Sequence, residues 1–217
     1  TIYTFAYVPL DLILGLAIAL LLNQKIRGIG IFRTIYYLPS VLAGVAYVVL
    51  WMWIFNPQAG LLNTVLSYVG IQGPRWLQDP EWALPAMVMM SLWGVGRSMV
   101  IYLAGLQDVP NEYIEAARID GANRVQTFSK IILPLLTPAI LFNLVFGVIT
   151  TFQSFTNVFV ATNGGPLNST LFYVLYLYRK AFEHLDMGYA SALAWILFLI
   201  VLICTVIIFV SSGKWVF

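Results

Sequence analysis

Long apolar runs alternate with short polar segments along this chain of 217 residues. A helix that crosses a bilayer core of about 30 Å needs about 20 mostly apolar residues. Five runs are long enough, at about 2–22, 35–55, 83–106, 131–162 and 188–211. A further apolar segment, about 171–182, is too short to span, so we expect it to form a short helix at the membrane interface. The pattern predicts an all-α integral membrane protein with a bundle of five transmembrane helices.

Composition agrees with a chain whose main solvent is lipid. Hydrophobic residues make up 61% and charged residues only 9%, whereas a soluble domain has roughly a quarter charged residues. The net charge of +2 gives no indication of a nucleic-acid partner. The single cysteine, Cys204, and the single histidine, His184, exclude a disulfide framework and a histidine-rich metal site. We therefore expect no metal.

Basic residues are distributed unevenly between the two faces of the predicted bundle. One face holds seven basic residues: Lys25, Arg27, Arg33, Arg118, Arg124, Lys130 and Lys214. The opposite face holds only Arg75, Arg179 and Lys180. Because loops rich in lysine and arginine stay in the cytoplasm, we predict that the face with seven basic residues is cytoplasmic. Residue 1 then lies outside, and the C-terminus lies in the cytoplasm.

A polar segment, 106–130, separates the third span from the fourth and is the largest polar stretch of the chain. Asp108 with Pro110 predicts the start of a helix, and Gly121 predicts its end. Asn123 with Gln126 three residues later resembles a capping box for a second helix, which could continue into the fourth span. Such a segment either receives a soluble partner or lies as an amphipathic helix against lipid.

The same segment carries a pattern with fixed spacing, Glu115-Ala116-Ala117, Gly121, Ile131 and Leu133-Pro134. In this pattern the chain resembles the permease subunits of binding-protein-dependent ABC importers. Other segments are similar to the carbohydrate, maltose-type branch of that family: Arg33-Thr34 before Leu38-Pro39, 51–63, 162–166 and 188–192.

The resemblance implies a type I ABC importer permease core over 1–217, with at least one further span upstream of Thr1, in a bacterial inner membrane. It implies that 106–130 is a cytoplasmic coupling loop that docks on the ATPase subunit, with Glu115, Ala116, Ala117, Gly121, Leu133 and Pro134 as its coupling residues. It also implies sugar contacts at Gly147, Thr150, Thr151 and Ser154 in the fourth span, and within Ser91–Ser98, which contains Gly94 and Arg97, in the third.

Polar and small residues recur on one helical face of the fourth span, at spacings of four, three, four and three: Asn143, Gly147, Thr150, Ser154 and Asn157. Polar groups that face lipid are unfavourable, so this face is predicted to line the bundle interior or an aqueous cavity. The alternative for the smaller residues is close packing between helices. The two asparagines and two hydroxyl groups favour a cavity.

Two charged residues, Asp11 and Arg97, fall inside predicted spans. Each carries an insertion cost of about 2.5–3.5 kcal/mol at the helix centre. They lie at overlapping predicted depths, so they could neutralise each other. Alternatively Arg97 faces the substrate.

We therefore expect a non-catalytic subunit of a carbohydrate importer that works by alternating access, most simply for an oligosaccharide. It carries no cofactor, and ATP and Mg²⁺ bind the partners. The expected partners are two ATPase subunits, a second and non-identical permease subunit, an extracytoplasmic sugar-binding protein that meets loops 56–82 and 163–187, and lipid. Three alternatives stay open. One is a permease for an anionic substrate, such as a uronic-acid oligosaccharide or a sugar phosphate. The others are an ATP-independent channel or secondary transporter, and an intramembrane enzyme, for which the sequence offers no nucleophile–base pair.

Overall fold

The computed structural model describes residues 1–24, 26–42 and 44–213, and every regular element in that part of the chain is helical. Lys25 and Lys214, which contribute to the predicted orientation, lie outside the described residues. Two helices are each long and apolar enough to cross a membrane, α1 (Ile2–Leu22) and α13 (Met187–Ser212).

Three further pairs of helices are long and apolar enough to span a membrane only when the two helices of a pair are taken together across a bend. The pairs are α2 (Ile29–Val41) with α3 (Gly44–Ile54) at 100°, α5 (Pro80–Leu92) with α6 (Gly96–Asp108) at 44°, and Arg124–Leu135 with α10 (Thr137–Phe152) at 63°. The described part of the chain therefore holds up to five spans, as predicted, and the all-α fold class is confirmed. The expectation of one continuous helix over 131–162 is wrong, because α10 ends at Phe152 and α11 (Thr156–Ala161) follows after a break.

Shorter helices occupy the two ends of the bundle. They are α4 (Leu61–Tyr68), α7 (Asn111–Ile119), α8 (Arg124–Thr127), the π-helical turn η1 (Phe128–Ile132), α9 (Leu133–Leu135), α12 (Tyr173–Tyr178) and the π-helical turn η2 (Arg179–Glu183). Helix α12 with η2 occupies the segment predicted to be a short helix, and neither is long enough to span.

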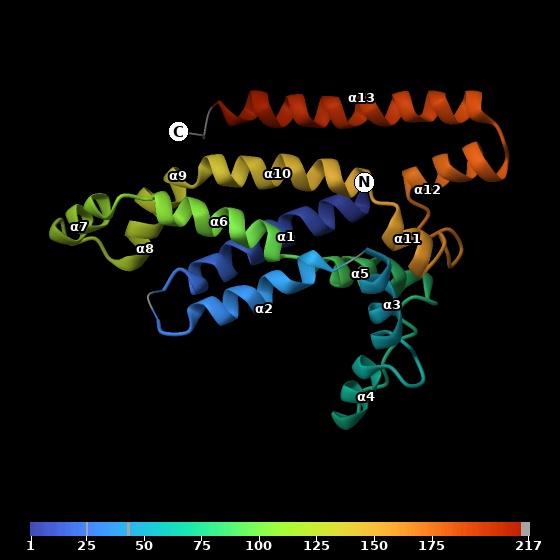
Figure 1. Ribbon diagram of the computed structural model, residues 1–217, viewed down its shortest axis with the longest axis horizontal. Coiled ribbons are helices and arrows are strands. Elements are labelled where there is room, and N and C mark those ends of the chain that lie inside the picture. The colour runs from blue at the N-terminus through green and yellow to red at the C-terminus, as the bar shows by residue number, and fades with distance from the viewer. Residues whose placement is uncertain (25, 43, 214–217) are drawn as a thin grey trace.

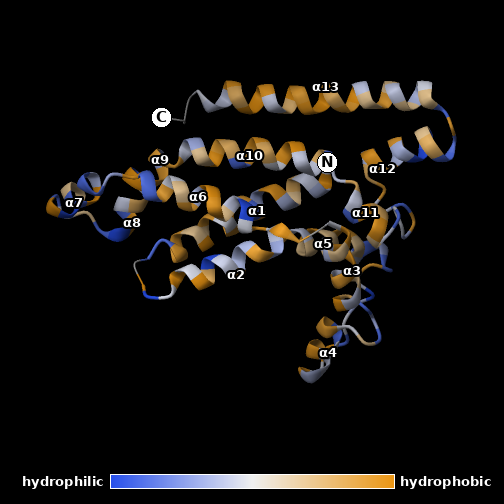
Figure 2. Cartoon of the chain, in the orientation of Figure 1, coloured by the Kyte–Doolittle hydropathy of each residue, from blue (hydrophilic) through white to orange (hydrophobic). Residues whose placement is uncertain are grey.

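The long helices lie side by side along one direction (Figure 1). The connection from α1 to α2, the α7–α8 segment and the C-terminal end of α13 lie at one end, whereas α11 and α12 lie at the other. Helices α3 and α4 extend sideways from the bundle near this second end. Figure 2 shows that α13 is apolar along its length and that polar residues gather at α7–α8 and before α13. The segments that carry most of the predicted cytoplasmic charges thus share one end.

Two hydrophobic clusters hold the bundle together. The first lies toward the α11–α12 end and contains Tyr3, Tyr47, Phe55, Trp76 and Met87 among its buried residues. The second lies toward the α7 end and contains Ala19, Met99, Tyr102, Leu106 and Leu136. Buried polar side chains separate the two clusters, and we call them the polar layer: Asp11 on α1, Ser98 on α6 and Asn143 on α10. The candidate site lies in this layer.

Candidate functional site

Two adjoining cavities open in the polar layer, with volumes of about 240 Å³ and 60 Å³. Helices α1, α5, α6 and α10 form their walls, and the larger cavity also reaches the junction of α2 and α3. Gly94, Arg97 and Thr150 line both cavities, so the two form one continuous site. We call this site the central cavity.

The predicted polar face of the fourth span lines the central cavity throughout. Asn143 and Gly147 line its smaller part, Ser154 and Asn157 its larger part, and Thr150 both. The face is not a single helix surface, because α10 ends at Phe152 and Ser154 lies in the break before α11. Thr151, the remaining position, also lines the larger part. The structure therefore places together all the fourth-span residues for which the sequence predicted sugar contacts.

The hydroxyl groups of Thr150 and Thr151 donate to their own helix, α10. Thr150 Oγ1 lies 2.8 Å from the Phe146 carbonyl oxygen, and Thr151 Oγ1 lies 2.8 Å from that of Gly147. This bonding leaves the hydroxyl oxygens free to accept a hydrogen bond from a ligand hydroxyl. Asn143 is buried, and its Nδ2 donates to the Ser98 carbonyl oxygen at 3.5 Å, which ties α10 to α6.

The two charged residues inside the spans meet at the central cavity but do not form an ion pair. Asp11 is buried and accepts a hydrogen bond from the Tyr7 hydroxyl group at 3.3 Å. The guanidinium carbon of Arg97 lies 5.7 Å from the centroid of the Phe146 ring. Within the described residues, the single ion pair joins Arg179 to Glu183. The neutralisation of Arg97 by a direct contact with Asp11 is therefore not observed, whereas its location in a cavity is.

Sequence reasoning missed the aromatic hydroxyl groups that α1 contributes. Tyr3 and Tyr7 line the larger cavity, and their rings stack with centroids 5.8 Å apart. The Tyr3 hydroxyl group donates to Ser91 Oγ at 2.7 Å, and Tyr47 lines the same cavity from α3. The spacing of Tyr3, Tyr7 and Asp11 at every fourth residue was the available signal, since it places all three on one helical face.

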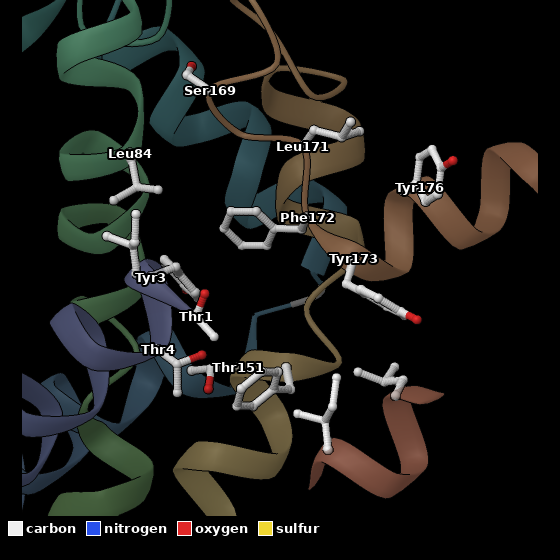
Figure 3. Close-up of a pocket in the computed structure, with 14 residues that line it drawn as sticks. Thr1, Tyr3, Thr4, Leu84, Thr151, Ser169, Leu171, Phe172, Tyr173 and Tyr176 are labelled. Carbon is white, nitrogen blue, oxygen red and sulfur yellow. The ribbon is translucent and has the colours of Figure 1, made fainter. Parts of the chain in front are cut away.

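A second, mostly apolar cavity of about 480 Å³ lies nearer the α12 end (Figure 3). Tyr3 and Phe172 meet in its wall with ring centroids 4.8 Å apart, and Leu84 lies on the same side of the cavity as Tyr3. Leu197 and Ile200 of α13 complete it. The surface of this cavity is more apolar than that of the central cavity, although hydroxyl groups such as those of Tyr173 and Tyr176 line it, and we do not include it in the candidate site.

The segment 106–130 forms a helical hairpin. Helix α7 ends at Ile119, and two residues later Gly121 adopts φ +78°, while the Ala122 amide donates to the Ala117 carbonyl oxygen at 2.9 Å. The predicted capping box is confirmed, because Asn123 and Gln126 bond reciprocally at 2.9 Å. The prediction that Asp108 begins this helix is wrong: Asp108 ends α6, and Pro110 precedes α7. The extended ψ of Pro110 turns the chain between the two helices.

A groove of about 920 Å³ lies between α7 and the α8–α9 segment. It brings together four of the predicted coupling residues, Ala116, Ala117, Gly121 and Pro134. Leu133 lies next to the groove in α9, and Glu115 is exposed on α7. Ala117 is buried, so it packs inside the hairpin, whereas Ile119 and Val125 are 87% and 73% exposed.

Comparison with known proteins agrees with this geometry. Residues 11–213 match the family described as binding-protein-dependent transport system inner membrane component. The chain belongs to this family. Over 99% of its length it is 48% identical to the probable ABC transporter permease protein YesP of Bacillus subtilis, and the match covers 70% of YesP. Over 98% of its length it is 35% identical to the multiple sugar-binding transport system permease protein MsmF of Streptococcus mutans, and the match covers 73% of MsmF.

Two solved structures share the fold of the permease. One is a bacterial ABC transporter that imports the acidic polysaccharide alginate, with a TM-score of 0.85 and 23% identity over 98% of this chain and 77% of that one. The other is the bacterial alginate transporter in complex with a pentasaccharide-bound periplasmic protein, with a TM-score of 0.83 and 24% identity over 95% of this chain and 74% of that one. The fold class of a type I importer permease is thus confirmed.

These findings confirm an integral membrane permease of the carbohydrate branch of the binding-protein-dependent ABC importers. The permease is a non-catalytic transport subunit, because ABC transporter permeases leave ATP hydrolysis to partner ATPase subunits.

Proposed function

We propose that this permease moves an oligosaccharide through the central cavity into the cytoplasm by alternating access, driven by ATP that binds with Mg²⁺ to two partner ATPase subunits. The observation that carries the proposal is the coincidence of the predicted polar face with a hydroxyl-rich cavity in the polar layer. Tyrosine rings and hydroxyl, amide and guanidinium groups are suited to a sugar, which presents apolar ring faces and many hydroxyl groups.

Coupling to ATP hydrolysis is assigned to the α7–α8 hairpin. Tyr113, Ile119 and Val125 are exposed apolar side chains among the charged residues of the hairpin. We take these exposed apolar side chains as a contact surface for a partner. We place the hairpin in the cytoplasm, with residue 1 outside, because the hairpin shares its end of the bundle with the connection from α1 to α2 (Figure 1), where Arg33 bonds the Leu22 carbonyl oxygen at the end of α1.

A second permease subunit would complete the central cavity. Helix α2 has no buried residue, and it carries Ile31, Phe32, Ile35 and Leu38 as exposed side chains. The larger cavity reaches Pro39 at the end of this helix, so a partner seated along α2 would close the cavity on that side. The family resemblance favours a non-identical partner.

The loops at the opposite end, 56–82 and 163–187, would receive the sugar-loaded binding protein. Asn63 stiffens the first of them, because its side-chain amide bonds the Pro57 and Pro74 carbonyl oxygens and accepts the Trp76 indole N–H at 2.7 Å. In the second, Arg179 holds the Asn163 carbonyl oxygen at 2.6 Å. Ordered loops of this kind present a fixed surface to a partner.

ATPase stimulation tests the proposal. The importer is reconstituted in lipid with its ATPase and second permease subunits, and ATP hydrolysis is measured with the binding protein empty and sugar-loaded. We expect the loaded protein to stimulate hydrolysis several-fold. Equal rates with loaded, empty and omitted binding protein would instead favour a channel or secondary transporter.

A further inference from the structure

Arg97 is the cation of the central cavity, and its hydrogen-bonding capacity is unused. A guanidinium group has five N–H donors and stays charged at all physiological pH values. Within the described residues, none of these donors has a hydrogen-bond acceptor and no carboxylate lies within ion-pair distance. The side chain is nevertheless exposed to the cavity, which it lines in both parts. By contrast, Arg33 uses Nε and Nη2 to cap the Leu22 carbonyl oxygen at the end of α1.

The surroundings hold Arg97 ready for an anion. Phe146 lies on one side of its guanidinium group at 5.7 Å, an arrangement that favours the charge without consuming a donor. Asp11, the acid of the same cavity, is buried and already accepts from Tyr7. The cavity therefore presents an accessible positive group, while its negative group is buried and hydrogen-bonded.

The break between α5 and α6 adds to the positive field. The 44° bend at Trp93–Val95 ends α5 and starts α6 at Gly96, one residue before Arg97, so the first turn of α6 lies at the cavity. The N-terminus of a helix carries a partial positive charge. At this break the amides of Gly94 and Val95 donate to the Ser91 and Leu92 carbonyl oxygens, so the contribution is that of the helix dipole. Broken helices that point such ends at a midplane site are a known means of holding anionic groups in transporters.

We propose that Arg97 binds the carboxylate of an acidic sugar, and that the substrate of this importer is an oligosaccharide that contains uronic acid. The inference rests on the proposed function and narrows its substrate class. A carboxylate fits the planar guanidinium fork through two parallel hydrogen bonds. Arg97 thereby distinguishes acidic from neutral sugars, while the hydroxyl groups of α1 and α10 contact the rest of the sugar.

Ligand-induced stabilisation of the assembled importer, without the binding protein, tests this inference. Digalacturonate and its neutral dimethyl ester serve as probes, and the shift in melting temperature is titrated for each. We expect the acidic probe to stabilise the wild type more than the ester does. In Arg97→Met the apparent affinity for digalacturonate should fall about 10- to 100-fold, with Arg97→Lys between the two. Affinity for the ester should stay unchanged.

Two control variants separate recognition from charge balance. Arg27→Met removes an exposed arginine in the loop after α1 and should leave both affinities unchanged. Asp11→Asn should retain the preference for the acidic probe, because Arg97 remains. If the wild type binds both probes equally or binds neither, or if Arg97→Met keeps the preference, the inference is overturned. The ATPase test is independent of these probes, so stimulation there would leave the proposed function intact.

Discussion

Close approaches at single residues set the geometry of the central cavity. A Cβ atom at Gly96 would collide with the backbone of Tyr36 and Tyr37, so this glycine lets α6 lie against α2. Gly15 is similar, because an added Cβ would lie 2.6 Å from Ser98 Oγ on α6. The backbone collision is the more severe of the two, since a side chain can rotate away and a helix backbone cannot.

Gly96→Ala should therefore destabilise the bundle. Overpacking costs about 1–3 kcal/mol, and here it would push α2 away from the residue next to Arg97. Gly30→Ala is the matched control, because this glycine also lies in a helix and has nothing within 4 Å of the added Cβ. Thermal unfolding of the purified complex should show a lower melting temperature for Gly96→Ala alone. Equal melting temperatures for the two variants would show that α2 and α6 are not tightly packed.

The residues of the site were predictable to different degrees. The stripe from Asn143 to Asn157 was visible because polar residues at helical spacing stand out in an apolar span. Tyr3 and Tyr47 were not predicted, because tyrosine is common both in cores and at membrane interfaces, and only the three-dimensional arrangement shows which hydroxyl groups face a cavity.

At the scale of elements, the positions of the helix breaks could not be predicted from the sequence. Five apolar runs were recognisable by length, but the bends at Trp93–Val95 and Leu136 were not predicted. Pro134 and Pro138 flank the second bend, and their missing amide groups explain why the helix breaks there. No comparable proline marks the first.

The prediction at this scale concerns the α7–α8 hairpin. Ala117 faces inward, so Ala117→Asp should disturb the hairpin itself, whereas Ile119 and Val125 face outward. Replacing Ile119 or Val125 with Ser should reduce the amount of ATPase subunit that copurifies with the permease, because apolar contact area is lost. Arg118→Gln, which changes an exposed polar residue of the same helix, is the control. Full recovery of the ATPase subunit with Ile119 and Val125 both replaced would exclude docking through this surface.

At the scale of the whole molecule, the chain is two apolar clusters joined through a polar layer. The clusters hold the helices at both ends, and the layer between them contains the buried Asp11, Ser98 and Asn143. Such a layer is costly in lipid unless water or substrate reaches it. Its position between the hairpin end and the loop end is the arrangement that the proposed alternating access requires, in which each end would open to it in turn.

The most direct test of the account is ATP-driven transport of a labelled oligosaccharide carried by the partner binding protein. The importer is reconstituted in vesicles with its ATPase subunits outward, binding protein inside and ATP outside, and export of the sugar from the vesicle lumen is measured. We predict transport toward the hairpin side against a concentration gradient, only with ATP. Thr150→Leu, which places an apolar side chain in the central cavity, should abolish it. Transport that persists without ATP, or that Thr150→Leu leaves unchanged, would contradict the account.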